Sequence, residues 1–150
     1  MIRSRLILLV EDNPDDADLT LRAFQHSKTV SQIVVARDGE QALDYLFAAA
    51  PDLNRDPKVL PDVVLLDLNL PKVDGLGVLQ RMRSDSRTRR LPVVVLTSSK
   101  EEKDIIRSYD LGANSFVQKP VDFVQFLNAA KQLGLYWLGL NEPPPVGRRI

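Results

Sequence analysis

The chain has 150 residues, enough for one domain with a proper core, and its 20 basic and 20 acidic residues leave no net charge. That balance gives no general electrostatic argument for binding nucleic acid or an acidic membrane surface. The absence of cysteine excludes disulfides and thiolate metal sites. No apolar stretch approaches the ~18 residues of a transmembrane helix, and the first apolar run leads directly into Glu11 and Asp12 instead of a signal-peptide pattern, so we expect a cytoplasmic protein.

Strand-like and helix-like segments alternate along the first half of the chain. Residues 6–10 predict a strand, and Asn13 caps a helix whose first turn carries a proline and two acids. A second strand at 33–36 precedes a helix that begins near Asp38. Positions 48–60 combine two prolines with polar residues, which predicts a long loop before the third strand.

The third strand-like run, residues 61–67, places four consecutive aliphatic residues directly before Asp67. Such a run is typical of a strand buried on both faces of a parallel sheet. The alternation continues with a helix near 76–83, a strand at 92–97, a helix at 101–111, a strand at 115–118 and a last helix after Pro120. Five strand-then-helix units with short links predict an α/β fold with a doubly wound parallel sheet and right-handed crossovers.

Residues with reactive groups stand where these strands end. Glu11 and Asp12 follow the first strand, Asp67 closes the third, Thr97 closes the fourth and Lys119 follows the fifth. Each residue alone would be interpreted as a helix cap or a solvated charge. Their joint placement favours a site, because open α/β sheets bind ligands at the carboxyl ends of their strands.

The residue types at this edge suit phosphoryl chemistry. Neighbouring carboxylates repel and raise one another's pKa unless a cation neutralises them. Mg²⁺ fits because it takes oxygen ligands and keeps several waters, which leaves a position for a phosphoryl oxygen. Asp67 can act as a nucleophile and form an aspartyl phosphate. Lys119 can pair with a phosphoryl oxygen, and Thr97 offers a hydroxyl donor.

Several motifs, taken in order, resemble the receiver domain of two-component response regulators over about residues 5–135. They are LLVEDN at 8–13, LLDLNLP at 65–71, DG at 74–75, LTSS at 96–99, GAN at 112–114 and KP at 119–120. The resemblance implies a flavodoxin-like sheet with strand order 2-1-3-4-5 and helices on both faces. It also implies a receiver domain over 1–140, and the proline-rich residues 141–150 are expected to form a flexible tail.

The resemblance implies a role for each residue of the acidic edge. Asp67 would accept a phosphoryl group from a phosphohistidine on a sensor histidine kinase. Mg²⁺ would be held by Asp12, Asp67 and the backbone carbonyl of Asn69, with Glu11 acting through water. Asn69 and Ser99 would flank the path of hydrolytic water and tune the lifetime of the phosphoryl group.

The implied response to phosphorylation involves Thr97 and Lys119, which would hold the phosphoryl oxygens. Phosphorylation adds about two negative charges, and Thr97 would move toward them. Phe116 would then rotate inward as the switch residue. The peptide bond between Lys119 and Pro120 is expected to be cis, a form almost confined to bonds before proline.

Two features of the sequence differ from those of compact receiver domains. The interval between Asp12 and Asp67 is longer by about one loop, which we assign to positions 48–60, and the last helix leads into an aromatic segment at 136–140. Together they resemble the stand-alone response regulators that pair with cyanobacterial and bacterial phytochromes. The resemblance implies a bacteriophytochrome as the partner kinase.

Output is expected to pass through protein contacts, because few residues follow the last helix and none would form an effector domain. The basic stretch at 81–90 fits a solvated loop better than a nucleic-acid site, since it has no aromatic residue for stacking. The partners would be a downstream protein target or a phosphotransfer protein. Tyr136 and Trp137 lie beyond the expected core, so we hypothesise a homodimer through the last helix and this aromatic segment.

Two other functions remain as alternatives. An aspartate-nucleophile phosphatase needs a second aspartate two residues after the nucleophile, where this chain has Asn69. We therefore expect no enzyme beyond a phosphoacceptor that catalyses its own phosphotransfer and slow dephosphorylation. A receiver-shaped interaction module that is never phosphorylated usually loses an acid or the lysine, and this chain keeps both.

Overall fold

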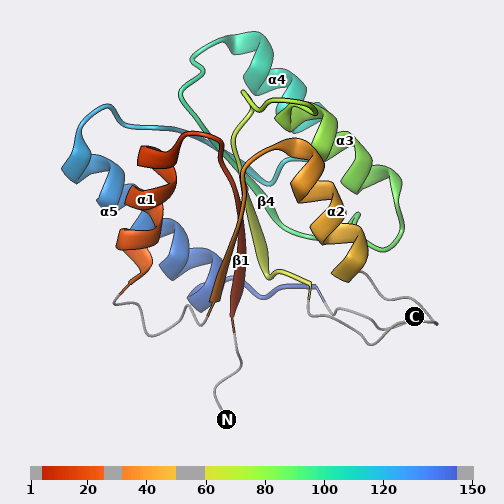
Figure 1. Cartoon of the computed structure of the whole chain (residues 1–150), viewed down its shortest axis with the longest axis horizontal. Coiled ribbons are helices and arrows are strands. Elements are labelled where there is room, and N and C mark those ends of the chain that lie inside the picture. The colour runs from red at the N-terminus through yellow and green to blue at the C-terminus, as the bar shows by residue number, and fades with distance from the viewer. Residues whose placement is uncertain (1–4, 26–31, 50–59, 145–150) are drawn as a thin grey trace.

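The computed structural model describes residues 5–25, 32–49 and 60–144. Its sheet consists of five parallel strands in the spatial order β2-β1-β3-β4-β5, which confirms the predicted flavodoxin-like order. The strands are β1 Leu6–Val10, β2 Gln32–Ala36, β3 Val63–Leu66, β4 Val93–Thr97 and β5 Ser115–Gln118. Because all pairs are parallel, the carboxyl ends of the strands meet at one edge, which is the upper edge in Figure 1.

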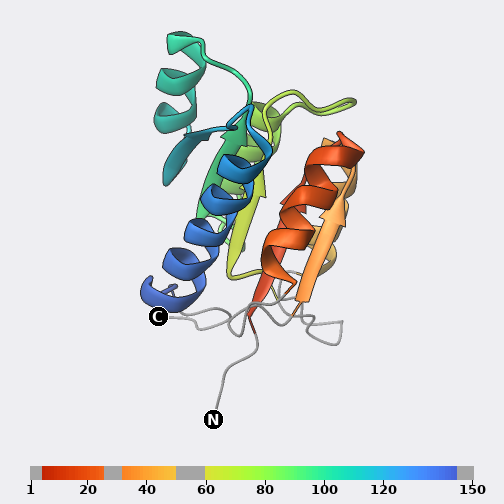
Figure 2. The same ribbon diagram turned by 90° about the vertical axis from the view of Figure 1, so that its left-hand side faces the viewer.

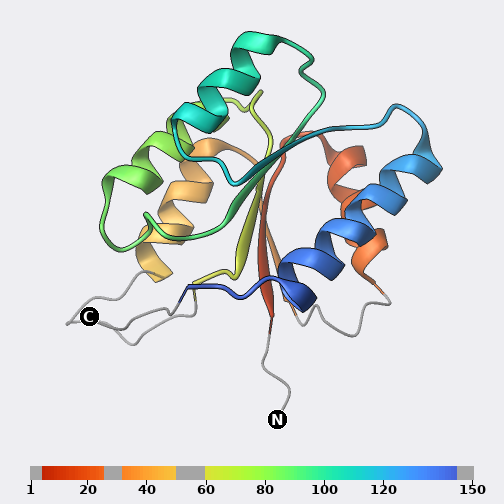
Figure 3. The same cartoon turned by 180° about the vertical axis from the view of Figure 1, so that it is seen from behind.

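Helices cover both faces of the sheet, as predicted. α1 (Pro14–Phe24) and α5 (Phe123–Gly134) lie on one face, and α2 (Gly39–Ala49) and α3 (Gly75–Ser84) lie on the other (Figures 1 and 3). α4 (Glu102–Asp110) stands on the side of α2 and α3, near the carboxyl ends of the strands. The edge that carries the reactive residues is therefore framed by the beginnings of helices from both layers.

The strands are apolar at consecutive positions because a separate hydrophobic core covers each face of the sheet. In β1, Leu8 and Val10 pack in the core under α2 and α3, whereas Ile7 and Leu9 pack in the core under α1 and α5. Alternate side chains of a strand point to opposite faces, so a strand buried on both faces must be apolar at every position. All five residues of β1 are buried.

Three helices begin at side-chain caps close to the carboxyl edge of the sheet. Asn13 caps α1, Asp74 caps α3 and Asp122 caps α5, each by accepting hydrogen bonds from backbone N–H groups two or three residues further along. Such caps satisfy donors that the first turn of a helix leaves unpaired. They fix where each chain segment turns from strand to helix, and so fix the frame of the site.

The structure corrects the predicted start of the loop at 48–60. α2 continues through Ala49, so the first two positions of that range are helical. Alanine has the highest helix propensity, which favours helix at these two positions. Positions 50–59 lie outside the described residues, as does the tail from 145 onward.

α5 continues into a feature that the sequence did not predict. Residues Leu135–Leu140 form a π-helix, η1, at the end of α5 that lies farthest from the carboxyl edge (Figure 2). Tyr136 and Trp137 meet there edge to face, with ring centroids 5.1 Å apart.

Among the residues that the structure describes, no helix combines the length and the hydrophobicity that a membrane span requires.

Candidate phosphoacceptor site

The register of the central strands brings two acidic residues together. Val10 and Leu66 are register partners in β1 and β3, so Glu11 and Asp67, the next residues along, emerge side by side at the carboxyl edge. The N–H of Asp67 donates to the carbonyl of Val10 at 3.1 Å, which extends the pairing past the end of β3. Both acidic residues are buried, and Asp12 beside them is exposed.

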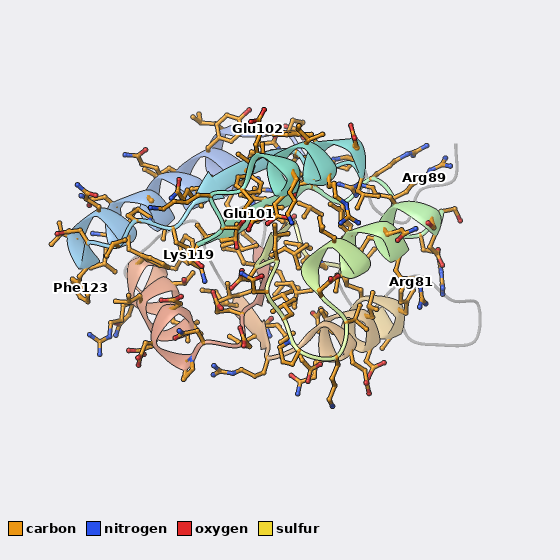
Figure 4. All side chains as sticks on the ribbon, turned by 90° about the horizontal axis from the view of Figure 1, so that it is seen from above. Arg81, Arg89, Glu101, Glu102, Lys119 and Phe123 are labelled. Atoms are coloured by element: carbon orange, nitrogen blue, oxygen red, sulfur yellow. The ribbon has the colours of Figure 1, made fainter. Side chains whose placement is uncertain are left out.

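The register of β4 and β5 places the other two predicted residues at the same edge. Thr97, fully buried, is the register partner of Gln118, and the N–H of Lys119 donates to the carbonyl of Thr97 at 2.7 Å. In Figure 4, which looks down on this edge, Lys119 lies beside α1. The side chain thus returns from an edge strand toward the centre of the sheet.

Lys119 is the centre of the polar network. Its ammonium contacts Glu11 Oε1 at 2.5 Å, Asp16 Oδ2 at 2.9 Å and Asp67 Oδ2 at 3.0 Å. A lysine ammonium has three donors and no acceptor, so these three carboxylates match its full hydrogen-bonding capacity. The buried charge is thereby compensated by groups from three separate segments of the chain.

Burial and charge set the protonation states in this network. Burial raises the pKa of Glu11 to about 7, more than the hydrogen bond from Lys119 lowers it. Burial also opposes ionisation of Asp67, but the charge and hydrogen bond of Lys119, with hydrogen bonds from Glu11 and Thr97, hold its pKa below the ordinary value. Burial would lower the pKa of Lys119, yet its hydrogen bonds to Glu11 and Asp16 raise it. At neutral pH both Asp67 and Lys119 are therefore charged.

Both oxygens of the Asp67 carboxylate have partners. Oδ2 accepts from Lys119, and Oδ1 accepts from the N–H of Asn69 at 3.3 Å. The hydroxyl oxygen of Thr97 accepts from the N–H of Ser99 at 3.3 Å, and the hydroxyl of Ser99 donates to Asp104 of α4 at 2.6 Å. The predicted site residues on β3 and β4 are thus bonded to the loops that follow them.

The glycine of the Asp74-Gly75 motif is required for steric reasons. A Cβ at this position would lie 2.2 Å from the backbone carbonyl oxygen of Asp67, closer than atoms can approach. The N–H of Gly75 also donates to the carbonyl of Leu68 at 2.9 Å. The start of α3 can therefore rest on the backbone that follows Asp67 only if this residue is glycine.

The acidic residues fit a hard divalent cation. Glu11, Asp12 and Asp67 each offer a carboxylate oxygen, and these ligand atoms lie within 4.8 Å of one another. Oxygen donors of this type, one of them exposed to solvent, match the preference of Mg²⁺ for carboxylates and retained waters. The residues present therefore fit the predicted metal.

One finding differs from the sequence prediction. No peptide bond in the described part of the chain is cis, so the predicted cis bond before Pro120 is wrong. The trans form of such a bond is favoured by only ~0.5–1 kcal/mol, so the Lys-Pro motif alone cannot decide the isomer. Phe116 is half-buried against the core under α2 and α3, and its switching role stays a prediction.

Asp16 is a site residue that the sequence interpretation missed. Its place in the sequence indicates only an acid in the first turn of a helix, yet its side chain accepts a hydrogen bond from Lys119. The available signal was its place one turn after the carboxyl end of β1, where α1 begins beside the predicted site.

Comparison with known proteins decides the family. Residues 7–131 match the response regulator receiver domain. The chain belongs to this family.

Two curated relatives are similar to this receiver over most of their length. One, a probable methanogenesis regulatory protein, FilR2, of Methanothrix harundinacea, is 42% identical over 139 residues, or 93% of this chain and 87% of the relative. The response regulator Rcp1 of Synechocystis is 34% identical over 134 residues, covering 89% of both chains.

Solved structures of phytochrome response regulators are among the structural neighbours of this receiver. The phosphorylated cyanobacterial phytochrome response regulator RcpA is 38% identical with a TM-score of 0.86, covering 95% of this chain and 100% of its own. The Mn²⁺-bound form of Rcp1 is 33% identical with a TM-score of 0.85, covering 94% and 99%. The bacteriophytochrome response regulator AtBRR is 54% identical with a TM-score of 0.68, covering 93% and 99%.

Proposed function

We propose that this receiver accepts a phosphoryl group on Asp67 from a sensor histidine kinase in a Mg²⁺-dependent reaction, and that it signals through protein contacts. The observation that carries the proposal is the buried Asp67 carboxylate, ionised at neutral pH and hydrogen-bonded to Lys119 at the carboxyl edge of the sheet. A membership in the receiver family supports the same chemistry.

The proposed step is a displacement at phosphorus. A carboxylate oxygen of Asp67 forms a bond to the phosphorus of a phosphohistidine while the phosphorus–nitrogen bond breaks. The electron pair of that bond stays on the imidazole nitrogen, which takes up a proton from water. Lys119 and Thr97 hold the phosphoryl oxygens, and positioning and electrostatics supply the catalysis.

Glu11, Asp12, Asp67 and the backbone carbonyl of Asn69 are the proposed holders of Mg²⁺. When bound, Mg²⁺ supplies positive charge that neutralises the carboxylates and attracts the phosphoryl oxygens. Support comes from the short spacing of the three carboxylates and from the Mn²⁺ bound to the similar protein Rcp1. Glu11 acts through water in this arrangement.

The signal leaves the site through β4 and β5. We assign the switch to Thr97, which moves toward the phosphoryl group, and to Phe116, which rotates inward. Ser99 and Asn69 tune the lifetime of the phosphoryl group. The N–H of Asn69 donates to the side chain of Asp67, and the N–H of Ser99 donates to the side chain of Thr97. Ser99 also contacts α4, so a change at Thr97 is communicated to that helix.

The proposed partner kinase is a bacteriophytochrome. The similarity to RcpA and AtBRR, which are phytochrome response regulators, supports this choice of partner.

The receiver domain, residues 1–140, would act on a downstream protein or a phosphotransfer protein in the cytoplasm. It would not bind nucleic acid, because three of the five arginines at 81–90 engage groups of the protein itself. Arg81 and Arg87 stack on Phe47, and Arg83 binds loop carbonyls.

We also propose a homodimer through α5 and η1. Large apolar side chains are exposed there, namely Leu135, Tyr136 and Leu140. Beside them is a hollow of about 500 Å³, lined by residues that include Val117, Leu133, Tyr136 and Trp137. An exposed apolar patch of this kind often marks a protein interface.

Intact mass after incubation with acetyl phosphate and Mg²⁺ tests the proposed function. The wild-type chain is expected to gain about 80 Da, one phosphoryl group on an aspartate nucleophile, and Asp67→Asn is expected to gain nothing. Asp12→Asn is expected to slow the gain without abolishing the acceptor. An equal gain in wild type and Asp67→Asn would assign the phosphoryl group to another residue and refute the proposal.

A further inference from the structure

Asp16 is a carboxylate at the site that lies outside the group able to hold a cation. It is the third residue of α1, and its Oδ2 accepts a hydrogen bond from Lys119 at 2.9 Å across 103 positions of sequence. Its side chain is 27% exposed, against 6% for Lys119. The contact therefore joins the solvent-facing start of α1 to a buried ammonium at the end of β5.

The three partners of Lys119 are not equivalent. Glu11 and Asp67 also belong to the group of carboxylates that can hold a cation, and Asp16 does not. A divalent cation held by Glu11 and Asp67 would compete with Lys119 for the negative charge of the same carboxylates. Asp16 is the partner that the ammonium keeps while the other two are engaged elsewhere.

We infer that Asp16 is a positioning residue that holds the ammonium of Lys119 over the acceptor, an inference that rests on the proposed function. A lysine side chain is flexible and loses much rotamer freedom when it is fixed in place. With one donor fixed on Asp16, the remaining two donors contact Glu11 and Asp67, beside which the oxygens of a phosphoryl group would lie. Asp16 also takes up one donor of Lys119 that would otherwise bond to the carboxylates proposed to bind the cation.

A simpler role for Asp16 would be that of any acid near the beginning of a helix. Acids there are stabilised by the helix dipole, and Asp15 in the same turn shares that property. Asp15 is exposed. It is therefore the matched control, because its removal changes the charge at the start of α1 by the same amount.

The first test compares the phosphorylation rate by acetyl phosphate and Mg²⁺ in the full chain. Asp16→Ala is expected to lower the rate about tenfold, the order of effect of one hydrogen bond to a charged group. Asp16→Asn keeps an acceptor oxygen and is expected to recover much of the rate, while Asp15→Ala stays close to wild type. A wild-type rate in Asp16→Ala would overturn the inference. So would equal losses in the Ala and Asn variants, or in Asp15→Ala.

The second test is a calorimetric Mg²⁺ titration of the same proteins, which needs no phosphorylation. In Asp16→Ala, the freed donor of Lys119 is expected to bond to Glu11 or Asp67, so Mg²⁺ should bind several-fold more weakly. Asp16→Asn should recover part of the Mg²⁺ affinity. Equal affinities in all variants would overturn the inference. If wild type binds Mg²⁺ but is never phosphorylated, the proposed function fails, and this titration still decides the role of Asp16.

Discussion

Lys119 connects segments that are distant in sequence, and its partners determine how the site titrates. Its ammonium compensates Glu11, Asp16 and Asp67, yet burial raises the pKa of Glu11, whereas Lys119, Glu11 and Thr97 together hold the pKa of Asp67 below its ordinary value. The two buried carboxylates therefore titrate in separate ranges. An ionised carboxylate beside an acid of raised pKa is the arrangement expected where two carboxylates lie close together.

Removal of the Glu11 charge is expected to flatten the pH dependence of stability. The pKa of Glu11 is about 7 in the folded chain and 4.5 ordinarily, so the folded state binds more protons between these values. The resulting stabilisation is complete below about pH 4.5 and is lost as the pH rises through about 7. Asp67, with a lowered pKa, loses its contribution only at lower pH. In chelator, wild type should lose unfolding free energy from pH 5 to 8 relative to Glu11→Gln.

Chemical denaturation at several pH values measures this difference. Groups common to both proteins cancel in the comparison. Parallel profiles would show that Glu11 is not the group that titrates. Added Mg²⁺ should reverse the trend in wild type, because a metal ligand must be deprotonated, so the stabilisation by Mg²⁺ grows with pH.

At the scale of elements, Arg83 ties α3 to the loops around it. Its guanidinium donates to the carbonyl of Gly112 through Nε and Nη2, at 3.0 and 2.8 Å, and to the carbonyls of Arg89 and Leu91 through Nη1. Gly112 has φ of 99°, a left-handed backbone that favours glycine. The turn between α4 and β5 is thus held by a side chain from α3.

Arg83→Met is expected to lower the unfolding free energy by about 3 kcal/mol, because several loop carbonyls lose a charged donor. Arg83→Lys should recover little, since an ammonium cannot reproduce the fork of a guanidinium. Arg81→Met, on the exposed side of the same helix, should cost less than about 1 kcal/mol, the worth of an exposed cation–π contact. Urea denaturation measures all three, and similar losses for Arg81→Met and Arg83→Met would contradict the role assigned to Arg83.

At the scale of the whole molecule, exposed apolar side chains lie at three places. They are α4, with Ile106 and Tyr109, the start of α5, with Phe123, and η1, with Leu135, Tyr136 and Leu140. The first two lie apart from each other near the carboxyl ends of the strands, and η1 lies toward the opposite ends (Figures 1 and 2). These surfaces can therefore serve different contacts, and the proposed dimer uses η1.

The two tyrosines offer a matched comparison for the dimer. Tyr136 is 49% exposed on η1 and Tyr109 is 51% exposed on α4. If η1 forms the interface, Tyr136→Glu should give a monomer and Tyr109→Glu a dimer, because burying an unpaired charge at an interface is costly. Sedimentation at high micromolar concentration, with and without phosphorylation, checks this. A monomeric wild type in both conditions would refute the dimer.

Much of the fold and part of the site could be predicted from local patterns. The aliphatic runs of β1, β3 and β4 indicated a parallel sheet, and the residues at their ends indicated which edge carries the site. The π-helix η1 was not predicted, because its apolar residues fit an ordinary helix equally well. The isomer of the Lys119–Pro120 bond was predicted wrongly, because the two forms differ little in free energy.

The sequence by itself determined the order of the elements, the reactive residues and the family motifs, since periodicity and strand ends are local properties. Only the tertiary structure decided which groups meet. The bond between Lys119 and Asp16 depends on how the start of α1, which follows β1, is placed against the residue that follows β5. The steric requirement for Gly75 depends on α3 resting on the backbone after Asp67. Such contacts join residues far apart in sequence, and a linear pattern carries no information about the distance between them.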